Sequence, residues 1–310
     1  MSSFTMPVPT RDEVRRGILY MIAAVFVFSL VNAAVKLSVA ELPISEVIFF
    51  RCLFAMLPCS LLVMTHGGLR SLRTRRFSWH LTRAIVQFAS MSSIFMASKL
   101  MPLADAVALS FSAPLFMTLF SIPILGERVG PYRWTAVLVG FAGVLVMAHP
   151  GAGTLSIGAL FAISNAVGSA CVTIGVRRMS VTESSATLVF YQTSITALFS
   201  LVLLPFSWVT PDWHEVALLA VVGLGSGVAQ YLWAQAFRFA PAAVAAPFNY
   251  TSMIWAMGLG FLLWGDLPTS DLAVGALIVA ASGLFIAYLE TRRRAEAAVP
   301  ALKLAAAAGD

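Results

Sequence analysis

A single arginine stands inside an apolar stretch of this 310-residue sequence. Arg51 lies about eight residues into the apolar run 44–64, which places it roughly 11 Å from the outer end of a helix. A guanidinium at that depth in a membrane costs at least about 2.5 kcal/mol unless it is paired or faces a cavity. Two roles are open for Arg51: it anchors a substrate carboxylate, or it pairs with Asp105 or with exposed backbone carbonyls. Asp105 is in turn a candidate charge partner, a proton site or an interfacial carboxylate.

Amide and aromatic side chains recur at helical spacing in four other apolar runs. Asn32, Asn165 and Gln230 each share a helix face with further polar or aromatic residues one and two turns away. In lipid these amides should face inward, where they either form hydrogen bonds between helices, worth about 0.6 kcal/mol each, or line a polar cavity. The residues on these faces are Phe28, Asn32 and Lys36; Gln87, Ser90, Met91 and Ile94; Asn165, Ser169 and Thr173; and Gln230, Trp233 and Phe237.

Three prolines mark positions where a membrane helix would lose a backbone hydrogen bond. Pro114 and Pro123 fall in the apolar run 103–124, and Pro247 falls in the run 242–264. Freed carbonyls within a membrane are tolerated where protein or a water-lined cavity satisfies them, and transporter sites often use such breaks. The candidate translocation path therefore consists of Asn32, Arg51, Gln87, Asn165, Gln230, Trp233, Asn249, Tyr250 and Trp255.

Other chemical signatures are weak or absent from the sequence. The phosphate-binding pattern G-x-x-x-x-G-K-[ST] does not occur, so transport would not be driven by a bound nucleotide. Gly223 and Gly227, at i and i+4 in an apolar run, are more typical of two closely packed helices than of a phosphate loop. The three cysteines lie in apolar runs without C-x-x-C spacing, and the four histidines lie at loops or span ends on both sides of the membrane. We therefore expect no metal, no cofactor and no enzymatic activity.

The composition places these residues in an integral membrane protein. It is 59% hydrophobic and 11% charged, whereas an average soluble chain is about 25% charged. Ten apolar runs are each long enough to cross a membrane as a helix, and they leave no room for a separate soluble catalytic domain. The predicted spans are 17–37, 44–64, 80–99, 103–124, 131–148, 155–176, 184–206, 215–237, 242–264 and 270–289.

The basic residues predict the orientation of these spans. A net charge of +6 could indicate a nucleic-acid partner. With a cytoplasmic N-terminus, however, 17 of the 20 Lys and Arg residues fall on the inner side, as the positive-inside rule requires. Both termini are therefore predicted to be cytoplasmic, and no nucleic acid is expected as a partner. The first span resembles a cleavable secretory signal, but the recurrence of the same element at the sixth span favours its retention.

The chain is predicted to be an internal duplication of five spans. Residues 96–102 match 235–241 at a shift of 139, and Phe49-Phe50-Arg51 matches Phe190-Tyr191-Gln192 at a shift of 141. Because five is odd, the second copy enters the membrane from the opposite side. Inverted repeats typically place a binding site near the midplane and exchange inward-open and outward-open forms, which favours a carrier over an enzyme, a channel or a scaffold. The two halves are residues 1–150 and 151–310.

Five motifs of the first half carry a family resemblance: Phe49–Phe54, Pro102–Ala106, Pro114, Leu125–Arg128 and Gly140–Val144. Together they resemble the drug/metabolite transporter superfamily, specifically its EamA-type carriers of ten helices in two inverted repeats. The resemblance covers about 17–290. The second half departs from the pattern, since Met253 stands in place of Pro114, Asp266 replaces the glutamate and Gln192 replaces Arg51. Equivalent residues of the two halves therefore need not share a role.

The resemblance implies transport of small metabolites. Such carriers include exporters of aromatic amino acids of the YddG type and importers of riboflavin or S-adenosylmethionine. The aromatic and amide residues suit a zwitterion with an apolar side chain, so the prediction is secondary or facilitated export of amino acids by alternating access. Uptake of a vitamin or nucleotide-like metabolite, such as riboflavin or S-adenosylmethionine, is the alternative. We expect a multi-pass protein of a bacterial cytoplasmic membrane, surrounded by lipid and acting as a monomer.

Overall fold

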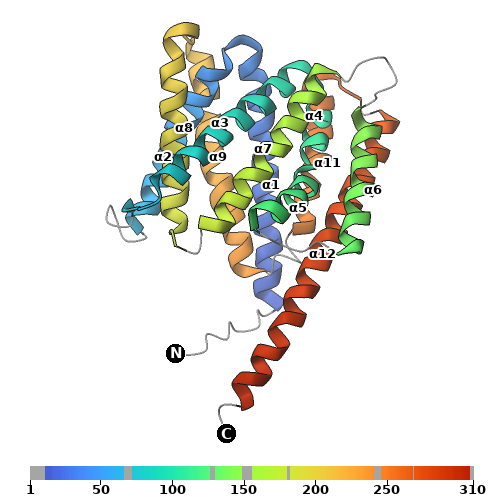
Figure 1. Cartoon of the computed structure of the whole chain (residues 1–310). Coiled ribbons are helices and arrows are strands. Elements are labelled where there is room, and N and C mark those ends of the chain that lie inside the picture. Colours follow the sequence, from blue (N-terminus) through green and yellow to red (C-terminus); the bar gives the residue numbers. More distant parts are fainter. Residues whose placement is uncertain are drawn as a thin grey trace.

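The computed structural model describes residues 11–65, 72–125, 130–148, 156–179, 182–240, 246–267 and 269–307. Within these ranges the chain is helical and contains no β-strand (Figure 1), which confirms the all-α prediction. The motif residues 126–128, and Pro241 in the repeat, lie outside the described ranges. The elements are α1 (Arg11–Glu41), α2 (Ile44–Thr65), α3 (Phe77–Leu100), α4 (Leu103–Ser110), α5 (Ala113–Leu125), α6 (Pro131–Ala148), α7 (Ile157–Met179), α8 (Ser185–Ser207), α9 (Trp213–Phe239), η3 (Ala246–Tyr250), α11 (Thr251–Trp264) and α12 (Ser270–Ala307).

Several of these helices have the length and composition of membrane spans. Among the described residues, five segments qualify by both measures, and two shorter apolar helices accompany them. α1 begins and α12 ends on the same side of the bundle, as Figure 1 shows. Ten spans with cytoplasmic termini stay a prediction from the sequence. The five segments are Asp12–Glu41, Leu103–Ile124, Ile157–Val176, Thr187–Ser207 and Trp213–Phe237.

Local sequence signals set several helix ends. The side chain of Asp212 accepts a hydrogen bond from the backbone of Glu215 at 2.7 Å, and Glu215 accepts one from the backbone of Asp212 at 2.6 Å, so a capping box starts α9. Ser184 caps α8 in the same way through the backbone N–H of Thr187. At the other end of a helix, Gly265 ends α11 with φ 70°, a left-handed conformation that glycine adopts without strain.

The fourth and ninth predicted spans are interrupted. A turn at Phe111 and Ser112 separates α4 from α5 within the predicted span 103–124, just before Pro114. Pro114 sits in the first turn of α5, where its missing N–H leaves no intrahelical bond unmade. Pro247 lies in the 3-10 helix η3 that precedes α11. Pro123, by contrast, lies inside α5 without ending it.

Helix packing follows the duplication. α1 lies along α9, and α7 lies along α3. These two contacts are equivalent, because α7 is the repeat of α1 and α9 is the repeat of α3. In the same way α2 packs on α8 and α6 packs on α12, each helix against its own counterpart. A Cβ atom at Gly223 would come within 2.3 Å of Phe54 Cβ, and one at Gly227 within 2.3 Å of Pro58 Cγ. These glycines therefore bring α9 onto α2, which confirms their predicted packing role.

Candidate functional site

A cavity of about 270 Å³ lies between the two halves, lined by residues of α1, α2, α3, α4, α7, η3 and α11. Four predicted path residues line it: Asn32, Arg51, Asn165 and Asn249. The helix breaks contribute directly, because Phe111 and Asn249 stand at the interruptions of the fourth and ninth spans. The apolar part of the lining includes Phe28, Phe95, Phe111, Ile94, Leu103 and Val107.

Arg51 is held by two neighbours that the sequence did not indicate. Its Nε donates a hydrogen bond to Ser226 Oγ in α9 at 3.0 Å, and its guanidinium lies 5.7 Å from the ring centre of Phe95. The hydrogen bond of this side chain thus goes to a serine, and not to Asp105 or to a carbonyl. Asp105 follows the cavity-lining Leu103 by two residues, which is about 200° around a helix and points it away from the cavity face of α4.

The three asparagines of the cavity differ in how much of their polar capacity is used. Asn165 donates to the backbone oxygen of Ser90 at 3.0 Å and to its hydroxyl at 2.9 Å, so it links α7 to α3 as well as lining the cavity. Asn32 and Asn249 have no hydrogen-bond partner among the residues that the structure describes. Their amides are therefore available to a ligand.

Five predicted path residues lie away from the lining. Gln87 donates to Met91 Sδ at 3.9 Å. Tyr250 and Trp255 pack beside the cavity, with ring centres 4.9 Å from Phe111 and 4.8 Å from Phe26 respectively. Gln230 is exposed, and Trp233 is 39% exposed with its ring 4.6 Å from that of Phe237. Helical spacing predicted which residues share a face, but it does not state which neighbouring helix covers that face.

One polar cluster that sequence reasoning missed lies beyond the C-terminal end of α3. Lys36 Nζ forms an ion pair with Asp266 Oδ2 at 3.3 Å and donates to the backbone oxygen of Met101 at 3.2 Å. It also lies 4.6 Å from the ring centre of Trp264. A single cation therefore joins the ends of α1, α3 and α11. The sequence signal was that Lys36 stands at the end of the predicted span 17–37 and Asp266 follows the predicted span 242–264 by two residues.

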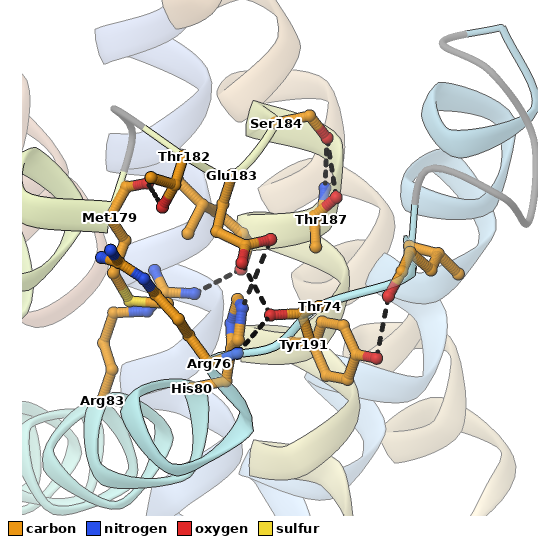
Figure 2. A network of polar contacts seen from close by, with 12 residues as sticks. Thr74, Arg76, His80, Arg83, Met179, Thr182, Glu183, Ser184, Thr187 and Tyr191 are labelled. Carbon is orange, nitrogen blue, oxygen red and sulfur yellow. Dashed lines mark hydrogen bonds and ion pairs between the residues drawn. The ribbon is translucent and has the colours of Figure 1, made fainter.

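A second polar cluster lies around the first turn of α3 (Figure 2). His80 lies in the first turn of α3, at a span end as predicted, and is fully buried. Its Nε2 lies 4.0 Å from Glu183 Oε2. Glu183 also accepts a hydrogen bond from Thr74 at 2.7 Å, and Tyr191 donates to the backbone oxygen of Leu72 at 3.0 Å. The cluster joins α3 to the start of α8. Across the described part of the chain, no three His, Cys, Asp or Glu residues come close enough to hold a metal ion.

Comparison with known proteins agrees with the duplicated architecture. The model of the EamA-like transporter family matches the chain twice, over residues 15–148 and 156–288. An S-adenosylmethionine uptake transporter of Rickettsia prowazekii is 28% identical over 89% of this chain and 94% of its own length. A riboflavin transporter of Vibrio cholerae is 29% identical over 90% of this chain and 95% of its own. The pseudopaline exporter CntI of Pseudomonas aeruginosa is 31% identical over 87% of this chain and 95% of its own.

A solved crystal structure shares the fold. It is 23% identical, covers 92% of this chain and 100% of its own, and superposes with a TM-score of 0.63. The family match, the apolar helices and the bacterial relatives together identify a multi-pass transporter of the bacterial cytoplasmic membrane. The chain belongs to the EamA-like transporter family.

Proposed function

We propose that this protein exports amino acids, including aromatic ones, by alternating access. The observation that carries the proposal is the charge of the central cavity: among the described residues that line it, Arg51 is the only charged one. A lone guanidinium surrounded by amides, hydroxyls and aromatic rings favours a ligand with one carboxylate and an apolar side chain. The α-carboxylate of an amino acid meets Arg51, and its α-ammonium meets asparagine oxygens.

The size of the cavity supports a small substrate. Its volume is about 270 Å³, just below the range of about 300–1,000 Å³ that small-molecule pockets occupy. An amino acid fits this volume, whereas riboflavin requires a more open form of the same cavity. S-adenosylmethionine carries a net positive charge, which Arg51 would repel. Uptake of either compound is the second candidate, because relatives of this chain carry those names.

The duplication supports the transport cycle. Counterpart helices pack on each other in pairs, and the two interrupted spans meet where the rings of Phe111 and Tyr250 lie 4.9 Å apart. In a duplicated carrier the halves exchange their conformations around a fixed site, and broken helices supply the backbone groups that face it. Export as the net direction is favoured by the relative named as an exporter, which is 31% identical.

The test is counterflow with purified protein in proteoliposomes. Vesicles are loaded with unlabelled phenylalanine or leucine, and uptake of the labelled amino acid is measured against riboflavin, S-adenosylmethionine and purines as competitors. Saturable exchange inhibited by amino acids is the expected result. Inhibition by riboflavin or S-adenosylmethionine alone would transfer the function to the second candidate, and the absence of any exchange would reject amino-acid transport.

A further inference from the structure

We propose that Ser226 is a positioning residue that turns Arg51 into a two-pronged receptor for the substrate carboxylate. The inference rests on the proposed function and concerns the same cavity. Arg51 Nε is occupied by Ser226 Oγ at 3.0 Å, whereas its two Nη groups have no hydrogen-bond partner among the described residues. Because Arg51 lines the cavity, these groups are the ones that a ligand can reach.

The serine can act only as an acceptor toward the arginine. Ser226 Oγ donates its own proton to the backbone oxygen of Val222 at 2.6 Å, one turn earlier in α9. The remaining lone pairs of this hydroxyl are then directed to Arg51 Nε, which has a single N–H to give. Ser226 is 6% exposed, so water does not compete effectively for this contact. The hydrogen bond therefore fixes the direction of the guanidinium plane.

The packing of α9 on α2 explains why so short a side chain reaches the arginine. Gly223 and Gly227 lie on the same face of α9 as Ser226, and a Cβ atom at Gly223 would come within 3.0 Å of the backbone oxygen of Arg51. The backbones are thus close enough for a serine to bridge them. On another side the ring of Phe95, itself 2% exposed, lies 5.7 Å from the guanidinium carbon. The arginine is held by the ring and by the hydroxyl.

A guanidinium held through Nε presents two parallel N–H groups to a carboxylate. This bidentate geometry gives selectivity as well as affinity, because a carboxamide offers only one acceptor oxygen and places an NH₂ group against the second Nη. The structure thus assigns to Ser226 a role in selecting acids over amides. Loss of the hydroxyl leaves the charge of Arg51 in place and removes its orientation.

The experiment measures this selectivity in counterflow. Exchange of labelled L-phenylalanine or L-leucine is measured with the acid and its carboxamide as competitors, in the wild type and in Ser226→Ala, Ser226→Thr and Arg51→Gln. Ser226→Ala is expected to raise the KM for the acid and to reduce the acid-to-amide preference about tenfold, with the maximal rate retained. Ser226→Thr keeps a hydroxyl and is expected to restore the preference.

Two controls separate positioning from structure. Ser200→Ala removes a buried serine that donates to the backbone oxygen of Thr196 in its own helix at 3.0 Å, and it should leave the preference unchanged. In an Arg51→Gln background, Ser226→Ala should have no further effect on the preference, because the group that it orients is gone. An effect of the same size in that background would overturn the inference.

The outcomes distinguish the inference from the proposed function. Saturable exchange with an unchanged acid-to-amide preference in Ser226→Ala would reject the positioning role and leave amino-acid transport standing. A loss of rate that is equal for acid and amide would also reject it, because a packing defect acts on both. If wild-type vesicles exchange neither phenylalanine nor leucine, the proposed function and the inference fail together.

Discussion

Arg51 and Gln192 occupy equivalent positions in the two halves of the duplicated chain, yet within the described ranges only Arg51 has a hydrogen-bond partner. Arg51 in α2 donates to Ser226 in α9 at 3.0 Å. Gln192 lies 141 residues later in α8, and the counterpart of Ser226, 139 residues earlier, is Gln87 in α3. Both amide atoms of Gln192 are buried without a hydrogen bond to any described residue, and Gln87 donates to the weak acceptor Met91 Sδ.

The halves differ at this pair but agree at the helix breaks. Ser110 and Asn249 are equivalent at a shift of 139, and both line the cavity. Their neighbours Phe111 and Tyr250 are equivalent too, and their rings pack 4.9 Å apart. The duplication has therefore kept the helix breaks beside the cavity, while the arginine–serine hydrogen bond is formed between α2 and α9 and, among the described residues, has no equivalent between α8 and α3. The cavity is lined mainly by residues of the first half, and a single guanidinium among them would give a bound carboxylate one defined orientation.

The largest expected effect comes from removing the charge that distinguishes the halves. Arg51→Ala should lower transport of the acid substrate about a hundredfold, because a bidentate ion pair in a desolvated cavity is lost. Arg75 is exposed in the segment before α3, and Arg75→Ala is the matched control with little expected effect. Initial rates of counterflow, corrected for the amount of protein in the vesicles, provide the comparison. Equal losses in the two variants would argue against a substrate contact at Arg51.

In the second half, a substitution at Gln192 should change the stability of the protein. Gln192→Leu replaces an amide whose two polar atoms are buried without a partner in the described part of the chain, so it should raise the free energy of unfolding by about 1–3 kcal/mol. Gln87→Leu is the control, with a smaller gain expected because this side chain is partly exposed and contacts Met91. The midpoint of thermal unfolding in detergent measures both. A lower midpoint for Gln192→Leu would mean that the amide has a partner in the protein.

The sequence could predict the frame of this molecule because the frame depends on local chemistry. Apolar runs predicted helices, and Pro114 and Pro247 predicted where two of them are interrupted. The burial cost of a guanidinium drew attention to Arg51, which does line the cavity. Spacing within one helix carries no information on which residue of a neighbouring helix it contacts. The contact of Arg51 with Ser226 in α9 was therefore not predicted. Ser226 lies between Gly223 and Gly227 on one face of α9. The predicted close packing of these glycines on another helix was the signal that could have indicated a contact of Ser226.

Helical spacing also could not show that Gln230 and Trp233 lie away from the cavity, although both were predicted to line the path. This difference between the halves gives the test with the smallest expected effect. Ile94 and Trp233 are equivalent at a shift of 139, but Ile94 lines the cavity whereas Trp233 is 39% exposed away from it. In a cysteine-free background, a polar thiol reagent should label Ile94→Cys slowly, and bound amino acid should reduce that rate severalfold.

Substrate should not protect Trp233→Cys from the reagent, because position 233 lies on a face of α9 that does not line the cavity. Labelling is followed by mass spectrometry with and without phenylalanine. Equal protection at positions 233 and 94 would show that position 233 lines the substrate path in the other conformation of the transport cycle. The two halves would then contribute equivalent residues to the path in alternate conformations.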